Sequence, residues 1–262
     1  MSETETWQVN AEAAEVYERE FVPAIFGEWA PRLCNAVGIK AGDTVLDVAC
    51  GTGVVAREAT RRGAVVTGLD LNGGMLAVAR REAPQVTFER GDATDLPFPP
   101  GSFAKVLCQF ALMYVPDRER ALSEMTRVTR PGGVAGFAVW ATLAESPGYQ
   151  LLAELAERAA GAETAAILRA PFVLGDREEL LALVATAGWR DVSLEPHVGA
   201  VRFPSVDEFV RAEVDGSPLA DTLGADGYEA LLAEARVGMA PFCTIEGLQF
   251  PIAANIVTTS RR

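Results

Sequence analysis

Residues 45–56 read VLDVACGTGVVA, an apolar stretch that passes directly into a glycine turn and then into a helical pattern. Gly51 and Gly53 lack a Cβ, so the backbone can turn tightly and approach a ligand closely. A helix that begins at such a turn presents unpaired N–H groups at its positive end. This stretch therefore predicts a strand–turn–helix junction that binds a nucleotide-type cofactor.

The junction alone leaves the identity of the cofactor open. Gly51-x-Gly53-x-x-Ala56 satisfies the dinucleotide fingerprint, and Asp70 follows about 20 residues later, where a ribose partner is expected. A nicotinamide-dependent reductase is therefore one alternative.

The short-chain form of such a reductase uses the pattern Y-x-x-x-K, which this chain lacks. Its two lysines are Lys40 and Lys105, and the residues four positions earlier are Ala36 and Gly101. The missing pattern excludes the short-chain type and leaves other types of reductase as alternatives.

Three further features favour a different cofactor. Asp47 lies inside the first strand, Asp92 stands in the sequence GDA after the third strand, and RPGG at residues 130–133 forms an expected closing turn. Together they resemble the class I S-adenosylmethionine-dependent methyltransferases, in the branch similar to ubiquinone and menaquinone biosynthesis methyltransferases (type 11). The resemblance implies an α/β, Rossmann-like, doubly wound seven-stranded sheet that is mostly parallel, with an antiparallel last strand and a helical lid.

The family resemblance also implies roles for the acidic residues. Asp47 orients the glycine loop and reaches the methionyl amino group through water, Asp70 accepts the ribose hydroxyls, and Asp92 accepts the adenine amine beside Ala93. A structural carboxylate, a helix cap and a turn former are the respective alternatives. Ala49 occupies the first glycine position of the family's fullest pattern, which is a familiar substitution in this branch.

Three aromatic residues and Gln109 complete the implied cofactor site. Gln109 and Phe110 follow the fourth strand and face the sulfonium and the substrate, whereas Tyr17 and Phe21 on the first helix close over the methionine end. Ordinary core packing is the alternative for these aromatic side chains. The full expected set of cofactor-binding residues is Tyr17, Phe21, Asp47, Ala49, Gly51, Thr52, Gly53, Asp70, Leu71, Met75, Asp92, Ala93, Gln109 and Phe110.

Two residues are candidates for catalysis. His197 is the chain's only histidine, and we expect it after the sixth strand, facing the lid, where a group that titrates near neutral pH can act as a general base. Tyr114 shares an apolar segment with Phe110 and Met113 and is the second candidate. The alternatives are a structural histidine and a core aromatic stripe.

Apolar runs alternate with helical patterns, which predicts a parallel sheet wound by right-handed crossovers. Proline-rich residues 96–103 are expected to form a loop. Asp117, Asp176 and Ser205 are expected to cap helices, and two further helices are expected at 54–62 and 72–83. The expected strands are 44–49, 65–69, 86–89, 105–109, 134–140, 190–203 and 248–260.

The length supports a single methyltransferase domain over residues 1–262. Its core is expected at 38–141, 172–204 and 244–262. The remaining helical segments, 1–37, 142–171 and 205–243, are expected to form the lid beyond the carboxyl ends of the strands.

Composition restricts the partners. A net charge of −13 argues against nucleic acid. The cysteines form no C-x-x-C pair, so neither a metal site nor a disulfide framework is expected. The polar start and the absence of an apolar run of about 18 residues predict a cytoplasmic protein without membrane insertion, monomeric or homodimeric.

The expected reaction is methyl transfer from S-adenosylmethionine to an O, N, S or C nucleophile of a small, partly apolar metabolite. NPPY-type tetrapeptides of amino-methyltransferases and the metal-assisted catechol pattern are both missing from the sequence. A protein of the same fold that binds S-adenosylmethionine without transferring its methyl group is the second alternative, beside the reductase.

Overall fold

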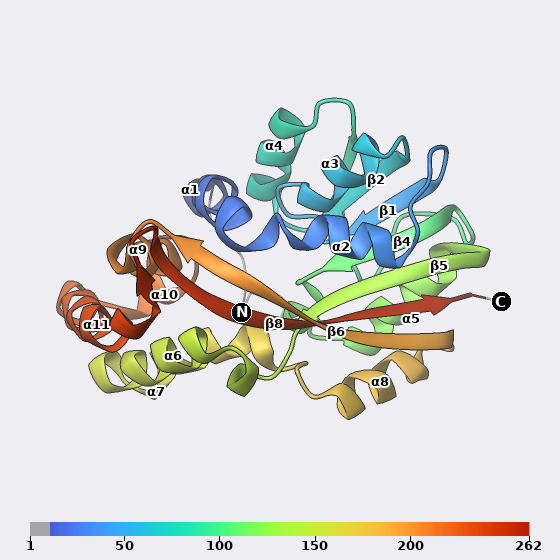
Figure 1. Cartoon of the computed structure of the whole chain (residues 1–262). Coiled ribbons are helices and arrows are strands. Elements are labelled where there is room, and N and C mark those ends of the chain that lie inside the picture. Colours follow the sequence, from blue (N-terminus) through green and yellow to red (C-terminus); the bar gives the residue numbers. More distant parts are fainter. Residues whose placement is uncertain (1–10, 262) are drawn as a thin grey trace.

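An eight-stranded sheet forms the centre of the computed structural model, which describes residues 11–261 (Figure 1). The strand order is β3-β2-β1-β4-β5-β8-β6, and the short β7 pairs with β8. The first five strands are parallel, whereas β8 runs antiparallel to both β5 and β6. The strands are β1 (Thr44–Val48), β2 (Val65–Asp70), β3 (Thr87–Arg90), β4 (Phe103–Gln109), β5 (Thr129–Trp140), β6 (Arg190–Phe203), β7 (Cys243–Thr244) and β8 (Gly247–Ser260).

The predicted fold class is confirmed, with one strand more than expected, because the chain turns back at residues 244–247 and adds the two-residue β7. The expected closing turn at RPGG is wrong, since these residues lie inside β5. Gly132 takes a left-handed φ of 72° there. Its N–H donates to the carbonyl of Arg261, and the N–H of Arg261 donates to the carbonyl of Gly133, so the pairing of β5 with β8 continues to Arg261.

Helices cover both faces of the sheet, with α2, α3 and α4 on one side and α5 and α8 on the other (Figure 1). The predicted caps are present: the side chains of Asp117, Asp176 and Ser205 each accept backbone N–H bonds. The helical segments are α1 (Ala11–Val16), the π-helical η2 (Tyr17–Phe26), α2 (Trp29–Ala36), α3 (Val54–Arg61), α4 (Gly73–Glu82), η3 (Leu112–Tyr114), α5 (Arg118–Val128), η4 (Leu143–Glu145), α6 (Pro147–Ala160), α7 (Ala162–Arg169), η5 (Ala170–Phe172), α8 (Arg177–Thr186), α9 (Val206–Asp215), α10 (Leu219–Thr222), α11 (Ala225–Gly238) and η6 (Ala240–Phe242).

Helix α2 packs against the sheet, although the sequence places residues 1–37 in the lid; residues 1–10 of that range lie outside the described part of the chain. The helix also protects the sheet edge. Glu28, just before α2, accepts the backbone N–H of Ala200 at 2.6 Å, and Arg32 donates to the carbonyl of Val198 at 2.9 Å. These bonds satisfy outward-facing backbone groups of the edge strand β6.

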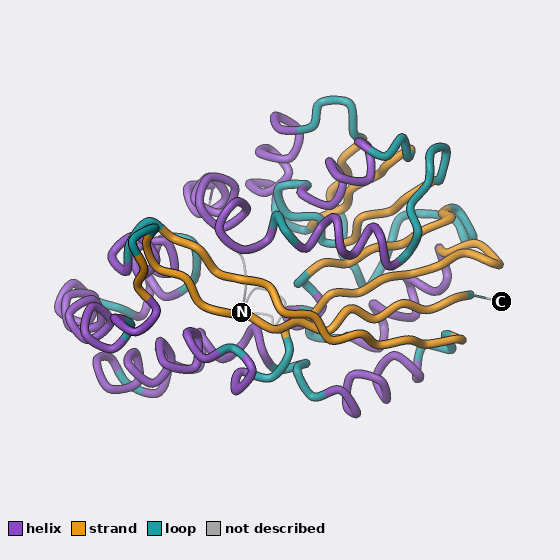
Figure 2. The backbone as a smooth tube through the Cα atoms, viewed as in Figure 1, coloured by secondary structure: helices purple, strands orange, loops and turns teal. Residues whose placement is uncertain are grey.

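Strands β6 and β8 extend beyond the rest of the sheet and carry a group of helices at their far end (Figure 2). The ring of Phe209 in α9 lies 5.3 Å from that of Phe250 in β8, and Tyr149 of α6 lies 5.7 Å from the same ring. Segments 142–171 and 205–243 therefore contribute to one aromatic-rich helical group.

Asp47 is a carboxylate in the middle of the central strand β1, with only 1% of its surface exposed. One of its oxygens accepts the backbone N–H of Ala56 in α3 at 3.0 Å. Burial raises the pKa of Asp47 to about 8, and the charge of nearby Asp70 adds to the rise against the opposing hydrogen bond. The side chain thus connects the strand to the helix that follows the glycine turn.

The contact between α2 and the sheet is testable at Gly136 in β5. A Cβ there would lie 2.3 Å from Val37 Cγ1 and 3.0 Å from a methyl group of Leu33. We expect Gly136→Ala to lower the free energy of unfolding by about 1–3 kcal/mol through overpacking, measured by urea denaturation. Gly224→Ala, where a Cβ meets nothing within 4 Å, is the control. Equal stability of the two variants would contradict the packing of α2.

The raised pKa of Asp47 predicts a pH dependence of stability. Between its unfolded value of 3.8 and its folded value of about 8, the folded state binds more protons, so stability falls as the pH rises. We expect Asp47→Asn to reduce this fall between about pH 5 and about pH 8 by on the order of 1–3 kcal/mol. Urea unfolding at the two pH values measures it, with Asp43→Asn as the control. If Asp47→Asn left the fall of stability with pH unchanged, the raised pKa of Asp47 would be refuted as its cause.

Candidate active site

A cavity of about 350 Å³, here called cavity 1, opens at the carboxyl ends of the parallel strands. This is where open α/β sheets bind ligands. Four predicted site residues do not line this cavity: Phe21, Thr52, Gly53 and His197. The predicted site residues that line it are Tyr17, Asp47, Ala49, Gly51, Asp70, Leu71, Met75, Asp92, Ala93, Gln109, Phe110 and Tyr114.

Two residues other than glycine hold left-handed backbone conformations at this cavity. Ala49 follows β1 with a φ of 53°, and Phe110 follows β4 with a φ of 52°. Such conformations are unfavourable for residues with a Cβ and concentrate at functional sites. Gly51, with a φ of 54°, also lines the cavity. Gly53 is also left-handed, with a φ of 85°, and a Cβ there would lie 3.1 Å from the ring of Phe88, so both the backbone and the packing favour glycine.

Asp70, at the end of β2, holds the loop that follows β1. Its Oδ2 accepts the N–H of Gly51 and its Oδ1 accepts the N–H of Asn72, both at 2.8 Å. Burial raises its pKa, against these opposing backbone bonds. The helix cap that the sequence allowed for Asp70 is instead supplied by Asn72, whose side chain accepts N–H bonds from the first turn of α4. Each carboxylate oxygen of Asp70 retains capacity for a further donor.

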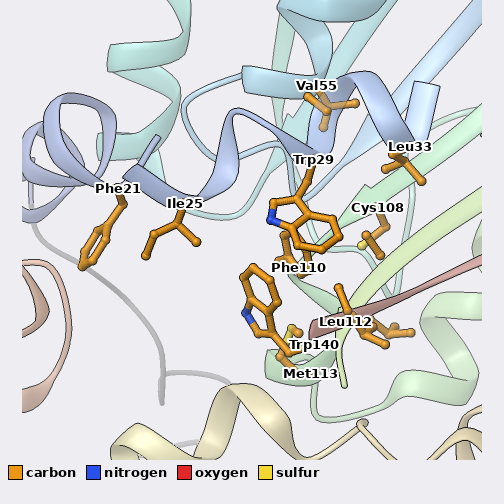
Figure 3. Close-up of a cluster of buried hydrophobic side chains, with 14 of the residues drawn as sticks. Phe21, Ile25, Trp29, Leu33, Val55, Cys108, Phe110, Leu112, Met113 and Trp140 are labelled. Atoms are coloured by element: carbon orange, nitrogen blue, oxygen red, sulfur yellow. The ribbon is translucent and has the colours of Figure 1, made fainter. Parts of the chain in front are cut away.

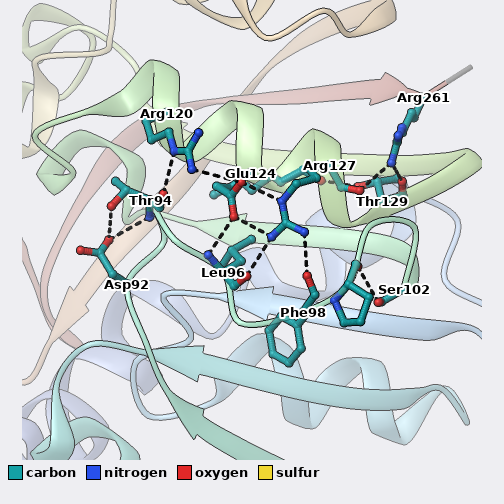
Figure 4. Close-up of polar contacts among 12 residues, drawn as sticks. Asp92, Thr94, Leu96, Phe98, Ser102, Arg120, Glu124, Arg127, Thr129 and Arg261 are labelled. Atoms are coloured by element: carbon teal, nitrogen blue, oxygen red, sulfur yellow. Dashed lines mark hydrogen bonds and ion pairs between the residues drawn. The ribbon is translucent and has the colours of Figure 1, made fainter.

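Asp92 forms a turn at the cavity wall. Its Oδ1 accepts both the N–H and the hydroxyl of Thr94 at 2.8 Å (Figure 4). The carbonyl of Thr94 in turn accepts a bond from Arg120 of α5 at 3.0 Å. The turn-forming alternative is therefore present, and no donor among the described residues bonds to the second oxygen of Asp92.

The loop after Asp92 is fixed by a buried acid that sequence reasoning missed. Glu124 of α5, 3% exposed, accepts the N–H of Leu96 at 2.9 Å. Arg127 pairs with Glu124 at 2.7 Å and donates to the carbonyls of Leu96 and Phe98 (Figure 4). The hydrogen bond to Arg127 lowers the pKa of Glu124. Because the proline-rich segment does not form a helix, its backbone groups are satisfied by side chains of α5 instead.

Gln109, at the end of β4, presents a free acceptor. Its Nε2 donates to the carbonyl of Phe26 at 3.4 Å. Its Oε1 is buried, and no donor among the described residues reaches it. A buried amide oxygen without a partner is unfavourable, so a ligand donor in cavity 1 would satisfy it.

A second cavity of about 120 Å³, cavity 2, adjoins the first. Four residues line both: Tyr17, Met75, Phe110 and Tyr114. Around this junction the rings of Phe110 and Trp140 stack with centroids 3.7 Å apart (Figure 3). Phe21 lines cavity 2 rather than cavity 1.

Among the residues that the structure describes, one carboxylate lies in the wall of cavity 2. Glu213 of α9 is 8% exposed and accepts the hydroxyl of Tyr149 at 2.7 Å. Burial raises its pKa to about 7, although the bond from Tyr149 opposes the rise. Sequence reasoning missed Glu213; the available signal was its position four residues after Phe209, on the apolar face of the helix.

The two candidates for catalysis have different outcomes. His197 does not follow a strand as expected: it lies within β6, opposite Ala254, with Nε2 3.8 Å from a carboxylate oxygen of Glu195, and it lines neither cavity. The strand has the predicted bounds of 190–203, so His197 falls inside it rather than after it. Tyr114 lines both cavities, but burial raises its pKa well above 10, which keeps it a neutral donor rather than a base. Met113 is buried beside it and lines neither cavity.

No helix within residues 11–261 combines the length and apolarity needed to cross a membrane. The same residues contain no group of three or more His, Cys, Asp or Glu side chains arranged to hold a metal ion.

Comparison with known proteins agrees with this geometry. Residues 46–137 match the methyltransferase domain family. The demethylmenaquinone methyltransferase of Renibacterium salmoninarum is 37% identical over 175 residues, which cover 63% of this chain and 74% of that protein.

Solved structures share the fold. A putative methyltransferase from an antibiotic biosynthesis pathway of Anabaena variabilis superposes with a TM-score of 0.69 at 17% identity, covering 89% of this chain and 96% of that one. Phosphoethanolamine N-methyltransferase 2 of Haemonchus contortus, in complex with S-adenosyl-L-methionine, gives a TM-score of 0.63 at 19% identity, covering 97% of this chain and 58% of that one. The family match and the sequence relatives show that this chain belongs to the class I S-adenosylmethionine-dependent methyltransferases, in the branch that includes the demethylmenaquinone methyltransferases.

Proposed function

We propose that cavity 1 binds S-adenosylmethionine and that cavity 2 binds a small, partly apolar methyl acceptor. The observation that carries this proposal is the junction of the two cavities at Tyr17, Met75, Phe110 and Tyr114. A cavity whose wall contains Asp47, Asp70 and Asp92 thereby adjoins an aromatic one across a shared wall. Bound S-adenosylmethionine supplies an electrophilic methyl group on a sulfonium.

The adenosine half fits the β2 and β3 ends of cavity 1. The carboxylate of Asp70 accepts the ribose hydroxyls, and its hydrogen bonds to the backbone hold it in place. Asp92 accepts the adenine amine through its remaining oxygen, beside Ala93. Leu71 and Met75 supply apolar contacts in the same wall.

The methionine half fits the β1 and β4 ends. The free Oε1 of Gln109 accepts from the methionyl amino group, with Asp47 and the loop at Ala49 and Gly51 beside it. The aromatic faces at the cavity junction suit a cationic sulfonium. Phe21 acts from the adjoining cavity, whereas Thr52 and Gly53 shape the loop without contacting the ligand.

The acceptor is inferred from the wall of cavity 2. Its aromatic side chains, together with the demethylmenaquinone methyltransferases among the relatives, favour a ring compound of quinone-like character. The protein's contribution is to hold the two reactants in contact and to exclude water, which supplies roughly 7–11 kcal/mol in well-oriented systems.

Calorimetry tests the proposed ribose contact. S-adenosylmethionine and S-adenosylhomocysteine should bind, and NAD should not. We expect Asp70→Ala to weaken S-adenosylhomocysteine binding by roughly 1.5–3 kcal/mol, because it removes charge-assisted hydrogen bonds. The control is Asp43→Ala, which removes a carboxylate bonded to the N–H of Lys40 at the opposite end of β1. If Asp70→Ala bound S-adenosylhomocysteine as tightly as the wild type, the ribose contact would be refuted and Asp70 would only hold the loop.

We also propose that η2 and the helical group formed by segments 142–171 and 205–243 close over the site as a lid. If so, S-adenosylhomocysteine should slow backbone hydrogen exchange in η2 and α9 more than in α8, which packs on the sheet away from both cavities. Hydrogen exchange with mass spectrometry measures this. Equal protection of all three segments would rule out a closing lid.

A further inference from the structure

We propose that Glu213 accepts the proton of an acidic hydroxyl on an aromatic methyl acceptor in cavity 2, with Tyr149 holding the carboxylate in position. This inference rests on the proposed function, because it takes cavity 2 as the acceptor pocket. It adds a proton acceptor in a segment outside the matched methyltransferase domain at residues 46–137.

Glu213 is a buried acid that has no cationic partner within residues 11–261. Tyr149 donates to its Oε1, and among the described residues no donor reaches Oε2. Arg211, on the same helix, instead pairs with Glu20 at 3.2 Å, and no described lysine or arginine lines cavity 2. A buried carboxylate with one unused oxygen is unfavourable for folding, so a ligand that donates to Oε2 would account for it.

The other titratable groups near Glu213 do not compete for the proton. Tyr149 of α6 and Tyr114 of η3 face it, and burial raises the pKa of both phenols well above 10. Tyr17 of η2 lines the same cavity, and burial raises its pKa in the same direction. On α9 itself, Asp215 is exposed and lies 4.0 Å from Arg211. Of the described residues in this pocket, Glu213 is thus the group that can exchange a proton near neutral pH.

A hydroxyl fits this pocket better than an ammonium group. The sulfonium of the cofactor lies next door in the proposed function, and a second cation in the low-dielectric pocket would be repelled by it. A neutral phenol-type hydroxyl avoids that repulsion and donates one hydrogen bond to Oε2. Its ring meets the aromatic walls contributed by Phe21, Phe110, Trp140 and Phe172.

The proton transfer balances the reaction. The acceptor oxygen forms the new bond to the methyl carbon, the electron pair of the broken carbon–sulfur bond stays on sulfur, and the hydroxyl proton passes to Glu213. The positive sulfonium becomes a neutral thioether as the carboxylate becomes a neutral acid. A neutral methyl ether is the organic product.

The test uses matched probes on the full chain saturated with S-adenosylhomocysteine. 4-Methylphenol and 4-methylanisole have similar rings, and only the phenol donates a hydrogen bond. In NMR titrations at about pH 8 we expect the wild-type protein to prefer the phenol by about tenfold. Glu213→Gln should lose most of this preference, whereas Asp215→Asn, which removes an exposed acid from the same helix, should keep it.

Tyr149→Phe supplies a second variant with a different readout. Because the bond from Tyr149 lowers the pKa of Glu213, its loss should shift the rise of the phenol preference with pH to higher pH. A purely structural Tyr149 would leave the midpoint unchanged. That result would remove the positioning role from the proposal.

Other outcomes separate this inference from the proposed function. If S-adenosylhomocysteine binds the wild type and Glu213→Gln equally but neither protein distinguishes phenol from anisole, the proton-acceptor role is overturned and the cofactor site stands. Tighter binding of phenyltrimethylammonium than of 4-methylphenol would make the pocket a cation site and overturn the proposal. Failure of S-adenosylhomocysteine to bind the wild type would overturn the proposed function itself.

Discussion

The buried carboxylate of Asp47 is the constraint on which the rest of the site depends. It lies in the central strand, where an acid is unfavourable, and it bonds to the first turn of α3 across the glycine loop. Asp70 holds the same loop from the neighbouring strand. Two acids on adjacent strands therefore fix the backbone between them, and the left-handed conformation at Ala49 persists because both ends of the loop are held.

The sequence predicts well those features that depend on local chemistry. Apolar runs and glycine turns locate the strands, and Asp117, Asp176 and Ser205 are found as caps because capping involves only neighbouring residues. Acids at strand ends meet in one cavity because parallel strands share an edge. The position of α2 on the sheet is not predictable in this way, since it depends on Gly136, a residue one hundred positions away from the helix.

Cavity 2 was likewise not predictable from the sequence, because residues far apart in the chain form its wall. Trp140 reads as an ordinary strand residue, and Glu213 as one acid among several on its helix, until the fold brings them to one pocket. His197 attracts attention as the chain's only histidine, yet β6 continues past it and leaves it outside both cavities. Residue type predicts chemistry reliably only where the local fold also determines what the side chain faces.

The contacts of Glu28 and Arg32 with β6 have a consequence for how the molecule behaves at high concentration. An edge strand with free backbone groups offers a template on which another chain can add a strand. Here the carboxylate of Glu28 and the guanidinium of Arg32 occupy backbone groups of Ala200 and Val198. Helix α2 and Glu28 just before it therefore also cover this part of the β6 edge, so the addition of another strand at these residues is disfavoured.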